Sequence, residues 1–260
     1  MTSFTAISPL KTLEDVSTLI DMLAFRAQHT PEKEAFIFNS DSVSHERLWN
    51  EVNHVASFLM AHGIRSGDRV MIIFPNGTEF FSAFYGIQRA GGVSVPIFPG
   101  SGMRRALAIF TACEAKAVIV PADTPQEMLD GYRQAVEAFG AKLFTFDECL
   151  QSGATGDFPE IEAEQLAFLQ YTSGSTGSSK GVMLTHKNLI ANLRQMIAGS
   201  NMTDEDVLVS WLPVYHDLGL ILMTMAPFYI GARLVLLPTS LTRMSHWLNA
   251  IETYKGTYTA

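Results

Sequence analysis

The sequence has few residues that could cross-link the chain. Only two of its 260 residues are cysteines, Cys113 and Cys149, and they form no CxxC pair and have no histidine beside them. This spacing suggests neither a disulfide framework nor a zinc site. It predicts two reduced thiols in the core of a cytoplasmic protein.

Positive charge is also scarce. The chain has 18 Lys and Arg against 26 Asp and Glu, a formal net charge of −8, and its basic residues form no run. Because nucleic-acid binding needs a basic surface, this balance argues against a nucleic-acid partner.

A long uninterrupted apolar segment is missing as well. The longest uncharged apolar stretch near the end, residues 218–232, is broken by Gly219, Pro227 and Gly231. It is shorter than the roughly 20 residues that a spanning helix needs. The N-terminus shows no basic segment followed by an apolar one, so we expect neither a signal peptide nor a membrane span.

What is present is enough apolar material for a substantial core. Hydrophobic residues make up 47% of the chain and charged residues 17%, with a mean hydropathy of +0.15. This composition excludes disorder as the main state, and the length allows one large domain or two modest ones.

Short apolar runs alternate with helical patterns along the chain. The runs at Val70–Phe74 and Ala117–Val120 are typical of parallel strands buried on both faces. Between such runs, Ser44 can cap a helix that Gly63 ends, and Thr124–Glu127 resembles a capping box with proline at the first helical position. We therefore predict an α/β fold with mainly parallel sheets flanked by helices.

Composition also suggests a division of the chain. Residues 151–160 are polar and contain glycine, as linkers do. We expect a first α/β subdomain over 1–150, a linker over 151–165, and the start of a second α/β subdomain over 166–260.

The clearest functional signal is the loop TSGSTGSSKG, residues 172–181, which lies between the apolar segments 166–171 and 182–184. Small residues let backbone amides converge on an anion, the hydroxyls add donors, and Lys180 adds a positive charge. The loop therefore predicts binding of nucleotide phosphates. Ser179 directly before Lys180 excludes the GxxxxGK[ST] loop, and the glycine spacing excludes GxGxxG. A flexible Ser/Gly linker is the alternative, which the flanking strands argue against.

Two motifs resemble a known family. YTSGSTGSSKGVMLTHKN, residues 171–188, resembles the signature of the adenylate-forming superfamily, with Ser179 where the family usually has proline. WLPVYHDLGL, residues 211–220, resembles the LPxYHDxGL segment of fatty acyl-AMP ligases. The resemblance implies an incomplete N-terminal domain of an acyl-adenylate-forming enzyme.

The resemblance also implies an activity and its residues. A fatty acid and ATP, with Mg²⁺, would give acyl-adenylate and pyrophosphate. The phosphates would be held by Thr172, Ser173, Gly174, Ser175, Thr176, Gly177 and Lys180. Lys180 and His216 would be catalytic, and the acyl side would use Tyr215, His216, Asp217 and Gly219. No metal ligand is assigned.

Each of these roles has a structural alternative. Lys180 could be a solvated surface lysine, and His216 could be a hydrogen-bonded core histidine. Asp217 could equally cap a helix that begins at Leu218. The apolar run 220–225 could wall an acyl tunnel or belong to the ordinary core.

The resemblance implies transfer of the acyl group to an acyl-carrier protein in lipid or polyketide biosynthesis. Two alternatives remain: a long-chain acyl-CoA synthetase, and a non-catalytic module that binds an acyl chain or a partner. The family's later motifs, its ribose-binding Asp and its C-terminal lid domain with a catalytic Lys do not occur in these 260 residues. We therefore expect that this chain alone does not turn over.

Overall fold

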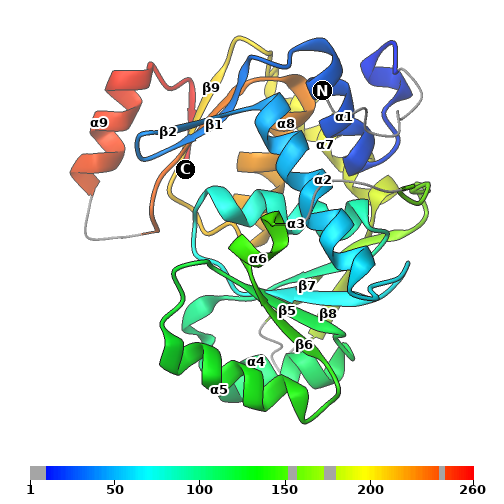
Figure 1. Ribbon diagram of the computed structural model, residues 1–260. Coiled ribbons are helices and arrows are strands. Elements are labelled where there is room, and N and C mark those ends of the chain that lie inside the picture. Colours follow the sequence, from blue (N-terminus) through cyan, green and yellow to red (C-terminus); the bar gives the residue numbers. More distant parts are fainter. Residues whose placement is uncertain (1–9, 152–156, 173–179, 240–243) are drawn as a thin grey trace. The chain divides into compact units, whose positions relative to one another are not determined.

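The computed structural model describes residues 10–151, 157–172, 180–239 and 244–260 (Figure 1). The described residues form two compact units. The first contains Glu51–Phe74 and Glu79–Thr185, and the second contains residues 10–50, Pro75–Thr78 and His186–Ala260.

The first unit is built on a six-stranded sheet with the order β6-β5-β3-β4-β7-β8. Its strands are β3 (Arg69–Ile72), β4 (Val93–Pro96), β5 (Ala117–Val120), β6 (Lys142–Thr145), β7 (Leu166–Thr172) and β8 (Lys180–Thr185). Neighbouring strands are parallel, except that β8 runs antiparallel to β7. This arrangement confirms the predicted mainly parallel sheet.

Helices cover both faces of this sheet, which explains the continuous apolar runs. The helices are α2 (His45–Ala61, from Glu51 onward in this unit), α3 (Thr78–Arg89), α4 (Met103–Ala112), α5 (Gln126–Glu137) and α6 (Phe146–Leu150), with a short 3₁₀ turn η2 (Pro99–Ser101). On one face, Met71 and Val118 share a buried cluster with residues of α4 and α5. The opposite face meets α3, where Ser94 Oγ donates to the carbonyl of Phe84 at 2.6 Å.

The second unit is built on a five-stranded sheet with the order β11-β9-β10-β1-β2. Its strands are β1 (Glu34–Phe38), β2 (Asp41–Ser44), β9 (Val207–Ser210), β10 (Arg233–Leu236) and β11 (Tyr258–Thr259). All neighbours are parallel except β1 and β2.

Helices flank this second sheet too. They are η1 (Leu13–Asp15), α1 (Leu19–His29), α7 (His186–Ser200), the π-helix η3 (Leu218–Met225), α8 (Ala226–Ile230) and α9 (Met244–Tyr254). Phe228 of α8 packs on Phe36 of β1 with ring centroids 6.0 Å apart. Val209 and Val235, which point to the other face, form a cluster with α9.

Two helix starts test the predicted caps. At α2 the prediction is confirmed, because the Arg47 amide donates to Ser44 Oγ at 3.1 Å. The capping box at Thr124 is wrong. Thr124 Oγ1 donates to the carbonyl of Pro121 at 2.7 Å, and Pro125 is the N-cap of α5 without a side-chain cap. The hydroxyl therefore stabilises the preceding turn instead of the helix.

The compact units are not contiguous in sequence. Strands β7 and β8, which follow the segment 151–165, join the same sheet as β3 to β6. They join it because β7 pairs in parallel with β4. The subdomain ranges 1–150, 151–165 and 166–260 stay a prediction.

Both cysteines are free and buried, as expected. Burial raises the pKa of the Cys113 thiol to about 11 and also raises that of Cys149. Within the described ranges, none of the helices is long and apolar enough to cross a membrane.

Candidate functional site

The predicted phosphate loop connects the antiparallel strands β7 and β8 of the first unit. Thr172 and Lys180 are the last pair of partners in this ladder, and both are exposed. Side chains of directly opposite residues lie on the same face of a sheet. The hydroxyl and the ammonium group therefore emerge together where the two strands open into the loop.

The remaining predicted phosphate ligands, Ser173, Gly174, Ser175, Thr176 and Gly177, lie outside the described residues. The strands on both sides of them are confirmed. Gly181 and Tyr171 pair directly, and a Cβ on Gly181 would lie 3.0 Å from the Tyr171 ring. A glycine at this position therefore lets the tyrosine ring lie over the hairpin backbone.

The second predicted motif follows β9 of the second unit. Residues 211–217 leave the carboxyl end of this strand and enter the π-helix η3. The His216 amide donates to the carbonyl of Pro213 at 3.1 Å, and the His216 carbonyl accepts from the Leu220 amide at 2.8 Å. The His216 side chain is 70% exposed, which excludes the interpretation as a core histidine.

Asp217 has two contacts at once. Its Oδ1 accepts from the Leu218 amide at 2.8 Å, which confirms the expected cap of the following helix. The same oxygen lies 2.6 Å from His216 Nδ1. Because Nδ1 faces the carboxylate, Nε2 is the ring nitrogen that the geometry leaves to a ligand.

Gly219 is a packing position. A Cβ there would overlap the carbonyl oxygen of Pro213 and lie 3.1 Å from Cβ of Leu212. The residue is buried. Its lack of a side chain lets the first turn of η3 lie directly against the loop that carries His216.

Tyr215 links two loops at the same end of the second sheet. It is half-buried, and its hydroxyl is hydrogen-bonded to the side chain of Thr239, which follows β10. Burial raises the pKa of Tyr215. Strands β9 and β10 are parallel neighbours, so their carboxyl ends meet there, the edge at which open α/β sheets bind ligands.

The structure places the predicted residues in two groups. Thr172 and Lys180 belong to the first unit, and the segment from Tyr215 to Gly219 belongs to the second. In the apolar run 220–225, Leu220, Met223, Thr224 and Met225 are buried, as in an ordinary core.

The sequence analysis assigned no role to Asn76. Its side chain is buried in the second unit and is hydrogen-bonded to three backbone groups of the loops after β9 and β10. A polar residue directly after a long apolar strand was the one available signal.

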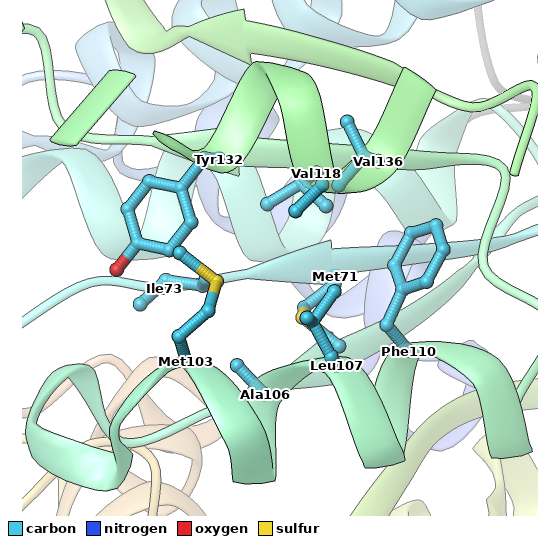
Figure 2. Close-up of a pocket in the computed structure, with 10 residues that line it drawn as sticks. Met71, Ile73, Met103, Ala106, Leu107, Phe110, Val118, Tyr132 and Val136 are labelled. Atoms are coloured by element: carbon cyan, nitrogen blue, oxygen red, sulfur yellow. The ribbon is translucent and has the colours of Figure 1, made fainter. Parts of the chain in front are cut away.

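An apolar cleft lies elsewhere, in the first unit, between α4, α5 and the sheet (Figure 2). Its empty space of about 240 Å³ includes open solvent, and Met103 and Tyr132 face each other at one end of the group of lining residues (Figure 2). The residues that line it are Met71, Ile73, Met103, Ala106, Leu107, Phe110, Val118, Tyr132, Ala135 and Val136. No charged side chain is among them, and Tyr132 is the one lining residue with a polar side-chain group.

A metal site is not visible either. Among the residues that the structure describes, no three His, Cys, Asp or Glu side chains lie close enough together to hold a metal ion. The sequence analysis assigned no metal ligand.

The chain belongs to the AMP-binding enzyme family, whose members it matches over residues 23–260. The mainly parallel sheets flanked by helices agree with this family.

Three relatives illustrate the similarity. The medium-chain-fatty-acid–acyl-carrier-protein ligase JamA of Moorena producens is 28% identical over 94% of this chain and 44% of its own length. FadD21 of Mycobacterium tuberculosis, named as a fatty-acid–CoA ligase, is 27% identical over 94% of this chain and 46% of its own length. The fatty acyl-adenylate ligase of L. pneumophila, solved with acyl adenylate and pyrophosphate, superposes with a TM-score of 0.86 at 30% identity, covering 97% of this chain and 45% of that one. The chain therefore spans less than half the length of these relatives.

Proposed function

We propose that the protein to which this chain belongs activates a fatty acid with ATP, giving acyl-adenylate and pyrophosphate. The observation that carries the proposal is the exposed His216, held against Asp217 at the carboxyl end of β9 in a member of the AMP-binding family. The similarity to a fatty acyl-adenylate ligase supports the choice of substrate.

The chemistry needs charge stabilisation more than proton transfer. A fatty carboxylate is ionised at neutral pH, so it can attack the α-phosphorus without a general base. The new bond joins a carboxylate oxygen to that phosphorus, and the bond to the pyrophosphate oxygen breaks. Two anions must approach each other, so positioning and electrostatic stabilisation carry the catalysis.

His216 has the geometry for this role. With Nδ1 against the Asp217 carboxylate, Nε2 can donate a hydrogen bond to a phosphate or carboxylate oxygen when the ring is protonated. In this proposal it contacts the oxygens of the reacting groups, while Tyr215 lines the acyl entrance.

Lys180 and Thr172 fit the phosphates of ATP. The two residues are exposed partners at the open end of the hairpin, so a hydroxyl and an ammonium group are available on one face. Ser173 to Gly177 would complete this phosphate site. Mg²⁺ would neutralise charge on the phosphates, and we assign it no protein ligand.

The acceptor distinguishes two versions of the proposal. Transfer to an acyl-carrier protein is favoured, since JamA is named for that reaction and the motif over residues 211–220 resembles that of acyl-AMP ligases. Transfer to coenzyme A is the second candidate, because FadD21 is named as a CoA ligase.

The test uses the full-length product of the gene that encodes this chain, together with the 260-residue chain itself. Each is mixed with ATP, Mg²⁺ and a long-chain fatty acid, and pyrophosphate release and acyl-adenylate are measured. We expect turnover by the full-length product and none by the 260-residue chain. His216→Ala should lower the rate by about 10²–10³-fold, as loss of an electrostatic donor does.

A matched control is His246→Ala, because His246 is an exposed histidine on α9 of the same unit. This variant should keep the rate of the parent protein. Adding coenzyme A or a phosphopantetheinylated carrier protein then identifies the acceptor. Fatty-acid binding without any adenylate would contradict the proposal and favour the non-catalytic module.

A further inference from the structure

The side-chain amide of Asn76 is hydrogen-bonded to the backbone of the His216 loop, which follows β9, and of the loop that follows β10. The residue is 5% exposed and lies four positions after the end of β3, in a segment that belongs to the second unit. Its Nδ2 donates to the carbonyls of Leu212 and Leu237, each at 2.9 Å. Its Oδ1 accepts from the Val214 amide at 3.0 Å.

The partners fix the orientation of this amide. A backbone N–H can only donate and a carbonyl can only accept, so the oxygen must face Val214 and the nitrogen must face the two carbonyls. Both donor hydrogens of Nδ2 and one acceptor site of Oδ1 are used. Because its hydrogen bonds are made, burying this amide costs little free energy. Removing the amide would leave the backbone groups that it binds without this partner.

These hydrogen bonds join two loops. Leu212 and Val214 follow β9, whereas Leu237 follows β10. The loops also meet through the Leu237 amide, which donates to the carbonyl of Ser210 at 2.8 Å. Asn76 thus connects the carboxyl ends of two parallel neighbours, at the edge where a ligand of such a sheet is bound.

His216 lies between two anchors. Before it, Asn76 holds the backbone at Leu212 and Val214. After it, the Leu220 amide bonds to its carbonyl and Gly219 packs on Pro213. The second anchor is part of η3. The first combines the Asn76 side chain, from a distant part of the sequence, with Ser210 Oγ, which accepts from the Leu212 amide at 3.2 Å.

We propose that Asn76 is a positioning residue that holds the backbone before His216, so that the imidazole is presented in one orientation at the carboxyl end of β9. This inference rests on the proposed function for the part that concerns catalysis. It assigns no contact between Asn76 and a substrate.

Two substitutions separate the contributions of the amide. Asn76→Asp keeps the shape and the acceptor for Val214, but it places a carboxylate oxygen against the carbonyls of Leu212 and Leu237. Asn76→Ala removes all the hydrogen bonds. The control is Val43→Ala, because Val43 is buried in β2, at the edge of the same sheet that lies farthest from β11 and β9.

The first measurement is native-state amide exchange and the imidazole NMR signals of His216 in the full 260-residue chain. In Asn76→Ala, exchange at Val214 should rise by roughly tenfold or more relative to Leu208 of β9. In both Asn76 variants the His216 signals should shift or broaden. In Val43→Ala the ratio of exchange at Val214 to that at Leu208 should stay as in the parent chain. Unchanged exchange and signals in both Asn76 variants would overturn the inference.

The second measurement is the kinetics of adenylate formation by the full-length product. Both Asn76 variants should lower kcat by roughly 10–100-fold, with KM for ATP close to that of the parent, since a small displacement of a catalytic group costs about this much. A parent-like kcat in a variant whose loop exchanges faster would refute the catalytic part. If the parent protein forms no adenylate, the proposed function fails, and the exchange data alone decide whether Asn76 orders the loop.

Discussion

At the scale of single residues, the His216 loop depends on close packing as well as on its functional side chains. Gly219 is the clearest case, because a Cβ there would overlap the Pro213 carbonyl oxygen. The obstacle is backbone, which cannot move aside as a flexible side chain can. We expect Gly219→Ala to lower the free energy of unfolding by about 2–3 kcal/mol, in the range of overpacked cores.

The control for this substitution is Gly199→Ala in α7 of the same unit. Nothing lies within 4 Å of a Cβ at Gly199. Since glycine is a poor helix former, this variant should gain up to about 1 kcal/mol. Urea unfolding of the 260-residue chain measures both, and equal stability of the two variants would show that Gly219 has room for a side chain.

At the scale of elements, α2 and α3 pack through a glycine. A Cβ on Gly86 would lie 2.5 Å from both Cβ and Cγ1 of Val55, so the helices approach closely at this point. Gly86→Ala should therefore lower the free energy of unfolding by about 1–3 kcal/mol. Val55→Ala removes Cγ1 but keeps Cβ, so it should relieve only part of the clash. The double variant should still be more stable than the sum of the single effects predicts.

A double-mutant cycle in urea tests this pair. Gly77→Ala serves as control, because nothing lies within 4 Å of a Cβ at Gly77. Gly77→Ala and Val55→Ala should add without coupling. Strict additivity of Gly86→Ala and Val55→Ala would argue against close packing of the two helices.

Some of the helices and strands could be predicted from the sequence, and others could not. The runs Val70–Phe74 and Ala117–Val120 predicted buried parallel strands, because their apolar pattern is local, and β3 and β5 confirm them. Strand β2 was not predicted, since Asp41 and Ser42 are exposed and polar, and its pairing with β1 decides its conformation. Helix α4 was not predicted either.

For the candidate site, the motifs identified the hairpin and the His216 loop because their residues are contiguous. Asn76 could not be predicted, because its partners Leu212 and Leu237 lie more than 130 residues away. Only the folded chain brings them together. The role of Gly219 likewise depends on the path of the Pro213 carbonyl, which no spacing reveals.

At the scale of the whole molecule, the two units should respond to pH in opposite directions. In the first unit, burial raises the pKa of Glu79 to about 7, with Asp123, Asp147 and Glu51 nearby. The folded state therefore binds this proton more tightly than the unfolded state. The stabilisation is complete below pH 4.5 and is lost as pH rises through 7, by about 1–2 kcal/mol after allowance for solvent screening.

In the second unit, burial lowers the pKa of His45 and of His186 to about 4 from 6.5. His186 must stay neutral at Nδ1 to accept from the Leu19 amide. Here the unfolded state binds more protons, so stability is full above pH 6.5 and is lost as pH falls toward 4.

Native-state amide exchange of the 260-residue chain, corrected for intrinsic rates, should resolve the two trends. From pH 5 to 7, protection at Val118 in β5 should fall while protection at Leu234 in β10 rises. Glu79→Gln should remove the trend at Val118 and leave that at Leu234. Parallel trends at both sites would contradict the assignment.

The pairing of β1 with β10 implies a delay during synthesis, because β1 is made long before its partner strand. Phe36 and Leu234 are partners in this ladder although 198 positions separate them. At a synthesis rate of about 5–20 residues per second, β1 is made roughly 10–40 s before β10. During that interval β1 can pair with β2, but neither β10 nor α8, on which Phe36 packs, has been made. The apolar side of β1 is thus open to a chaperone until these later elements follow.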